Sequence, residues 1–229
     1  MWVYIGTTEL KNVYIGEYDF AKYQKVEYIQ STATSPWGDA SSGQYIDTWV
    51  TINKNIKIEI DGYFTVNTVQ QRLFWGWYDS WSSWISFTVY INWSWYWARA
   101  TSNWQWNWQS TSKWGVTDRR IVTLYNSKFK LVQWSIGSTI YDNTNTATIS
   151  NSDTWTIPLL AYKDRTNNKI NRHASAKLYS CKIWDNDVLV RDFVPCYRKS
   201  DNEIWLYDMT NKVFYSNAGT GTFTKWVDM

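Results

Sequence analysis

The stretch NIKIEID, residues 55–61, alternates polar and apolar residues without a break. Successive side chains of a β-strand point to opposite faces of the sheet. Ile56, Ile58 and Ile60 therefore share one face, and the charged residues share the other. This pattern is typical of an antiparallel strand with one buried face and one wet face.

Segments of the same kind follow one another along the chain, and no stretch of useful length repeats at the helical period of 3.6 residues. We expect strands at 26–30, 44–51, 55–61, 69–74, 85–92, 120–125, 128–133, 156–162, 176–184 and 188–193. Many short strands without intervening helices are typical of a β-sandwich or barrel. The sequence therefore predicts an all-β fold.

The last two of these strands flank Asp185-Asn186-Asp187, which predicts a hairpin. A tight turn at Asn186 and Asp187 sets Cys181 opposite Asp192 and leaves Cys196 several positions further along. Strand rise then separates the two cysteine Cα atoms beyond the roughly 7 Å that a disulfide allows. We expect two free thiols, as in a protein that folds in a cytoplasm.

Composition excludes several classes of protein. The 229 residues carry a net charge of +3, with Lys and Arg scattered along the chain rather than gathered in a stripe, so we expect no nucleic-acid partner. No apolar run approaches the roughly 20 residues that span a bilayer, so we expect no membrane insertion. The N-terminus lacks the features of a classical signal peptide.

The first residues contain a short repeat. VYIG at residues 3–6 recurs at residues 13–16. Such a strand-turn unit cannot bury a core of its own. We interpret 1–22 as an N-terminal attachment segment and 23–229 as the sandwich, with an ordinary N-terminal hairpin of the same domain as the alternative.

Tryptophan occurs where turn chemistry favours glycine. The chain has 19 Trp and 10 Gly, and a turn-rich β protein should hold more than the average share of glycine, about 7%. Trp81 follows Asp79-Ser80, and Trp93 follows Asn92, where Asn-Gly would form a tight hairpin turn. Our hypothesis is that most of these Trp are glycine in the native protein, because its UGA codons are read as glycine. Trp184, in a strand, is exempt.

The alternative is that the tryptophans are real. Trp104, Trp106 and Trp108 recur at period two in a polar loop. In an extended chain they would point to one side and form an aromatic platform for sugar stacking. So many exposed indoles would favour aggregation, which weighs against this interpretation.

Several segments resemble a known family. VEYIQST at 26–32, GQYIDTWV at 43–50, PCYRKSD at 195–201 and NAGTGTF at 217–223 are similar to motifs of phage and prophage structural proteins. That family has a concanavalin A-like, laminin-G-like sandwich, so the resemblance implies a jelly-roll fold and a virion-associated, host-surface or glycan-binding role. Trp49, Trp205 and Trp226 stand where the family pattern has glycine. The resemblance transfers no binding residue.

Candidate catalytic and metal-binding groups have simpler interpretations. Glu59 and Asp61 share the polar face of one strand and are expected to be solvated, although a glycosidase also needs two carboxylates. Asp185, Asn186 and Asp187 could bind calcium through oxygen, but hairpin turns favour these residues for conformational reasons. We expect His173 to be exposed on a loop. We predict no enzyme, cofactor or metal.

The sequence therefore predicts a virion protein, made in the host cytoplasm, that recognises a bacterial cell-surface glycan and contacts other virion proteins. Loops at one rim are the expected site. The candidate ligand residues are Tyr78, Tyr96, Asn103 and Asn107. The alternatives are a purely structural decoration protein and, less favoured, a degraded glycan hydrolase.

Overall fold

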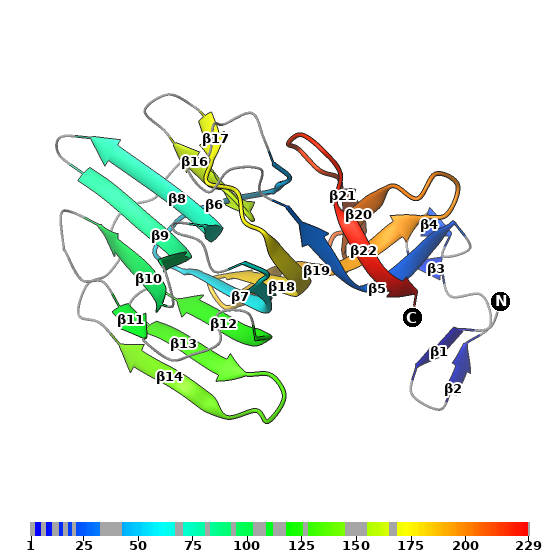
Figure 1. Ribbon diagram of the computed structural model, residues 1–229, viewed down its shortest axis with the longest axis horizontal. Coiled ribbons are helices and arrows are strands. Elements are labelled where there is room, and N and C mark those ends of the chain that lie inside the picture. The colour runs from blue at the N-terminus through cyan, green and yellow to red at the C-terminus, as the bar shows by residue number, and fades with distance from the viewer. Residues whose placement is uncertain are drawn as a thin grey trace.

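The computed structural model describes residues 3–5, 8–10, 14–15, 18–19, 22–32, 43–66, 71–80, 83–92, 95–102, 109–111, 118–125, 128–144, 155–164 and 169–228. The regular elements in these ranges are all β-strands (Figure 1). Within the same ranges, no helix has the length and apolar character needed to cross a bilayer.

The larger sheet has ten strands. They are β5 (Tyr23–Ser31), β7 (Ile56–Phe64), β12 (Arg120–Tyr125), β13 (Lys128–Gln133), β14 (Thr139–Thr144), β18 (Ala176–Asp185), β19 (Val188–Arg198), β20 (Ile204–Asp208), β21 (Val213–Tyr215) and β22 (Thr224–Asp228). Their order is β14-β13-β12-β7-β18-β5-β19-β20-β21, with β22 paired to β5. All of these pairings are antiparallel.

The second sheet has eight strands. They are β6 (Ile46–Thr51), β8 (Arg72–Ser80), β9 (Ser83–Asn92), β10 (Trp95–Ser102), β11 (Gln109–Thr111), β15 (Thr156–Leu159), β16 (Tyr162–Asp164) and β17 (Lys169–Asn171). The main order is β11-β10-β9-β8-β15-β6. β16 pairs with β17 and, in parallel, with β8.

One hydrophobic core joins the two sheets, which confirms the predicted all-β, sandwich-like architecture. In β7 the residues alternate strictly between buried and partly exposed, with Ile56, Ile58 and Ile60 in the core as the sequence predicts. Phe64 and Phe193 of the larger sheet are fully buried, as is Phe74 of the smaller sheet, and all three belong to the same cluster. Burial of an aromatic side chain of this size contributes about 1.5–3 kcal/mol.

The N-terminal segment forms two hairpins outside both large sheets. β1 (Val3–Ile5) pairs with β2 (Thr8–Leu10), and β3 (Tyr14–Ile15) pairs with β4 (Tyr18–Asp19) (Figure 1). Each copy of the VYIG repeat therefore supplies the first strand of one hairpin. The attachment role of 1–22, and its treatment as a unit separate from 23–229, remain predictions.

Several predicted strands have other bounds than the observed ones, and two differ by a shift or an interruption. The strand expected at 69–74 starts at Arg72 and continues to Ser80 as β8, while residues 69 and 70 lie outside the described part of the chain. The strand expected at 156–162 is interrupted between β15 and β16. Leu160 takes a φ of 67° there, and its N–H donates to the carbonyl of Leu73 at 2.6 Å. Apolar patterning could not reveal this kink, since Leu160 is as buried as its neighbours.

The predicted hairpin at Asn186 and Asp187 is present, with φ values of 51° and 61°. The expected register is wrong by one residue because of a β-bulge. Trp184 of β18 pairs with Leu189 and Ile183 pairs with Arg191, so β19 has one extra residue between these pairs. Cys181 consequently pairs with Phe193 rather than with Asp192. Local turn chemistry predicts the turn but not an irregularity further along the ladder.

Both cysteines are free and buried, as expected. Burial raises the pKa of the Cys196 thiol to about 12 and raises that of Cys181 well above its ordinary value. Since the thiolate is the reactive form, we expect iodoacetamide at pH 8 to leave both residues unmodified in the folded protein and to alkylate both in urea. Mass spectrometry measures this directly, and rapid alkylation of the folded protein would contradict it.

The same shifts make stability depend on pH. A thiol whose pKa is higher in the folded than in the unfolded chain destabilises the fold once the unfolded chain can ionise. We therefore expect the free energy of unfolding to fall as the pH rises above roughly 8.5, the ordinary thiol pKa.

His173 is buried and not exposed on a loop, so that expectation is wrong. Its side chain is 2% exposed and lies against the backbone of Gly43. A Cβ atom at residue 43 would come within 2.3 Å of the imidazole Cγ, so this close approach requires glycine. The contact joins segments 130 residues apart in sequence, which local reasoning cannot anticipate.

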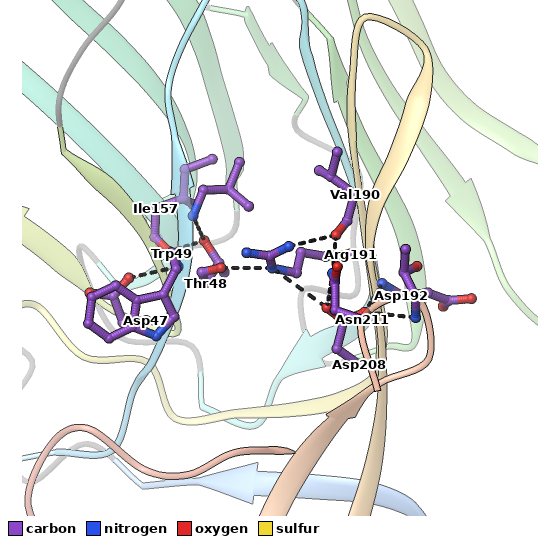
Figure 2. Close-up of polar contacts among 11 residues, drawn as sticks. Asp47, Thr48, Trp49, Ile157, Val190, Arg191, Asp192, Asp208 and Asn211 are labelled. Carbon is purple, nitrogen blue, oxygen red and sulfur yellow. Dashed lines mark hydrogen bonds and ion pairs between the residues drawn. The ribbon is translucent and has the colours of Figure 1, made fainter. Parts of the chain in front are cut away.

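A largely buried ion pair of the ten-stranded sheet is hydrogen-bonded to the second sheet (Figure 2). Arg191 of β19 lies 3.6 Å from the carboxylate of Asp208 in β20, and its Nε donates to the carbonyl of Thr48 in β6 at 3.0 Å. Asp208 is completely buried and accepts hydrogen bonds from the backbone N–H groups of Asp192 and Thr210, each at 3.0 Å. Asn211 donates to the second Asp208 oxygen at 2.6 Å. We call these residues the Asp208 network.

Candidate functional site

A groove lies on the outer face of the ten-stranded sheet, where one strand exchanges partners. One edge of β18 pairs with β5 at residues 176–178 and then with β19 at residues 181–185. Tyr179 and Ser180 lie at this changeover and line the groove, together with Val194 of β19. β5 and β19 also pair directly with each other, Lys25 opposite Cys196, so the groove lies where these three strands meet.

A β-bulge in β18 lies beside the groove. On the opposite edge of β18, Leu178 pairs with Gly62 and Ser180 pairs with Asp61, so Tyr179 is the extra residue. A Cβ atom at Gly62 would lie 2.5 Å from the carbonyl oxygen of Lys177, so the bulge fits only against glycine. Because of the bulge, Tyr179 and Ser180 follow each other outside the core, with no buried residue between them.

Arg119 occupies the centre of the groove. Its Nε and one Nη donate to the two carboxylate oxygens of Asp61 at 2.8 and 2.7 Å, which is a bidentate pair. The guanidinium stacks on the ring of Tyr179 at 3.5 Å and on that of Trp134 at 3.8 Å. A guanidinium held by a carboxylate and by aromatic rings is fixed in orientation, so it presents its remaining N–H groups in a defined geometry.

The groove is balanced in charge and has room for a ligand. Lys25 and Glu27 of β5 complete its lining, so two cations face two carboxylates. Glu27 lies 3.8 Å from Arg119 and its side chain is 43% exposed, whereas that of Asp61 is 15% exposed. The groove volume is about 500 Å³, which is within the range of ligand sites.

The aromatic surface continues beyond the groove. Tyr179 contacts Tyr28 of β5 at a ring-centroid distance of 5.1 Å and Tyr63 of β7 at 6.3 Å. Lys177 lies 4.2 Å from the ring of Tyr28, and hydrogen bonds to Tyr28 and Tyr63 raise its pKa although burial opposes the change. Burial, followed by the neighbouring Tyr63, raises the pKa of Tyr179 to about 12, so its hydroxyl is neutral at physiological pH.

A second hollow, of about 430 Å³, is lined by Asp201, Glu203 and Asn217 among others. Arg198 binds both carboxylates, and this lowers the pKa of Asp201. Asn217 accepts from the N–H groups of Tyr45 and Gly219 and donates to the carbonyl of Gly221. These polar groups therefore hold the loop together. In the described part of the chain, no three or more His, Cys, Asp or Glu residues gather as a metal site would need.

The structure separates two of the predicted ligand residues. Tyr78 of β8 pairs with Ile85 of β9, and Tyr96 of β10 pairs with Ile91 at the other end of β9. Six residues of strand correspond to about 20 Å, so the two tyrosines do not form one site. The remaining candidates lie outside the described residues, namely Asn103, Asn107, Trp104, Trp106 and Trp108.

The groove residues were missed by sequence reasoning. Asp61 was noted only as one of two carboxylates on a polar strand face, and its partner Arg119 lies 58 residues away. Tyr179 occupies an ordinary position in an alternating strand. An aromatic residue and a carboxylate on the polar faces of two strands were the available signal, but nothing local indicated that those strands are neighbours.

Comparisons of the chain with protein-family models, with curated proteins and with solved structures find no match.

Proposed function

We propose that this protein is a non-catalytic virion component that recognises a bacterial surface glycan through the outer-face groove. The observation that carries the proposal is the fixed Arg119, stacked on Tyr179 and paired with Asp61 in a groove of ligand size. The finer fold assignment, a concanavalin A-like jelly roll, belongs to the same proposal.

The chemistry of the groove suits a neutral sugar chain. Sugars present a flat C–H surface that packs on aromatic rings and neighbouring hydroxyl groups that both donate and accept hydrogen bonds. The groove offers aromatic surface, the donors Lys25 and Arg119, and the acceptors Glu27 and Asp61. Its balanced charge gives no general attraction to nucleic acid, which requires an excess of cations.

The arrangement of carboxylates favours binding over hydrolysis. A glycosidase places two carboxyl groups on opposite sides of the bond that it cleaves. Glu59 and Asp61 instead lie two residues apart on the same face of β7. Both carboxylate oxygens of Asp61 also accept hydrogen bonds from Arg119. A carboxylate engaged in this way is poorly placed to act on a substrate.

The virion assignment derives from the motifs that resemble phage structural proteins. The segment at 26–32 lies largely in β5, and the segment at 195–201 begins in β19. Glu27 of the first segment lines the groove, as does Val194, the residue directly before the second segment.

We expect the purified protein to bind at least one cell-wall or capsular glycan on a broad glycan array and to bind whole host cells. Absence of binding on both would contradict the proposal. Assembly onto particles without affinity for cells would instead indicate a structural decoration protein. Release of soluble sugar from host polysaccharide would indicate a hydrolase.

A further inference from the structure

Trp49 occupies a backbone conformation that favours glycine. It lies in β6, where Thr51 pairs with Thr156 and Asp47 pairs with Pro158, so β6 has two more residues than β15 between these pairs. The excess forms a bulge, and Trp49 has a φ of 55° within it. Its N–H donates to the side chain of Asp47 at 3.0 Å, which holds the bulge in place (Figure 2).

The side chain of Trp49 gains little that offsets this conformation. A bulky residue with positive φ brings its Cβ against its own backbone, and glycine avoids the clash. Leu160 also has a positive φ, but its side chain is fully buried and both of its backbone groups are hydrogen-bonded. The side chain of Trp49 is 69% exposed, so little burial offsets the strain.

Two further tryptophans fall between paired strands in the sequence. Ser80 pairs with Ser83, and Asn92 pairs with Trp95. Residues 81–82 and 93–94 lie outside the described part of the chain, and each pair reads Trp-Ser in the sequence. Two-residue hairpin connections favour turns that need positive φ, and type II′ needs glycine at the first position.

The hairpin between β18 and β19 has the residues that such a turn favours. Asp185 pairs with Val188 across Asn186 and Asp187, which have φ values of 51° and 61°. Asn and Asp tolerate positive φ, whereas a Trp-Ser sequence does not suit such a turn.

We propose that residues 49, 81 and 93 are glycine in the native protein, because the codon rendered here as tryptophan is read as glycine in its source. The backbone at residue 49 and the turn-like sequence positions of residues 81 and 93 favour the same substitution. The low glycine count, 10 in 229 residues, agrees with it.

The proposal does not extend to every tryptophan. Trp184 lies in β18, where the ammonium group of Lys57 is 4.1 Å from its ring. Trp205 packs edge-on against Phe214 at 5.2 Å, and Trp226 lies in β22. Neither of the last two has a positive φ, so the backbone does not require glycine there.

Thermal unfolding of four variants tests the structural argument. We expect Trp49→Gly to melt about 2–4 °C above Trp49→Ala, because alanine retains the Cβ that causes the strain. The control is residue 184, which lies in the interior of a strand. There we expect the opposite order, with Trp184→Gly melting at a lower temperature than Trp184→Ala. Equal melting temperatures for the two residue-49 variants would overturn the argument.

Peptide mass spectrometry of the protein from its native source tests the identity directly. Peptides that cover residues 49, 81 and 93 should contain glycine at all three positions. Tryptophan in any of these peptides would overturn the proposal for that position. The result is independent of glycan binding, so failure of the proposed function would leave this inference intact.

Discussion

An Asp208→Ala variant is expected to lose about 3–5 kcal/mol of the free energy of unfolding, the usual cost of breaking a buried ion pair. Asp208 is fully buried, and its carboxylate accepts from two backbone N–H groups and from Asn211. Its removal takes one acceptor from each of these donors and the partner carboxylate from the guanidinium of Arg191 at 3.6 Å. Arg191 keeps its hydrogen bonds to the carbonyls of Thr48 and Val190, so the loss falls mainly on the unpaired charge of the guanidinium.

Urea unfolding followed by circular dichroism measures this loss. The matched control is Asp142→Ala, which removes an exposed carboxylate that pairs with Lys128 at 3.3 Å. Exposed pairs contribute about 0–1 kcal/mol, so the control should remain close to the parent. Similar small losses in both variants would show that the Asp208 network does not hold the sheets together.

An Arg119→Ala variant is expected to bind the recognised glycan at least about tenfold more weakly, which corresponds to about 1.4 kcal/mol. Arg119 supplies charged donors at the centre of the groove and fixes both Asp61 and the ring of Tyr179. Without it, Asp61 loses its partner and the ring loses its stacked neighbour. The groove would then present its polar groups in no fixed orientation.

The control for this prediction is Arg198→Ala. Arg198 is also partly exposed and also binds carboxylates, Asp201 and Glu203, but it lies outside the groove. Titration calorimetry with one purified polysaccharide should show unchanged affinity for this variant. An equal loss of affinity in the two arginine variants, or no loss in either, would show that the groove is not the glycan-binding site. Matching circular dichroism spectra would establish that both variants are folded.

The fold was predictable where burial alternates along a strand. The strict pattern at 55–61 places Ile56, Ile58 and Ile60 in the core, as observed. The predicted strands 120–125 and 128–133 match β12 and β13 at both ends. In these segments the apolar residues of the alternating pattern are also the residues that are buried, so local information is sufficient to predict the strand.

Bulges and long-range contacts were not predictable from the same patterns. The bulge in β19 shifts the partner of Cys181 by one residue, and the bulge in β18 leaves Tyr179 and Ser180 together outside the core. His173 is buried against Gly43, and Arg119 pairs with Asp61. Each depends on which strands become neighbours, and local patterning does not carry that information. The proposed groove therefore lies apart from the rim loops that sequence reasoning favoured, and those loops remain a prediction.

Saturation-transfer NMR with fragments of a cell-wall polysaccharide tests the central claim most directly. Irradiation of the aromatic protons of the protein should transfer saturation to the ring protons of the sugar, and the transfer should fall sharply in the Arg119→Ala variant. That result would locate the glycan at the stacked surface of Tyr179 and Arg119. Undiminished transfer in the variant, or no transfer in the parent protein, would contradict glycan recognition by the outer-face groove.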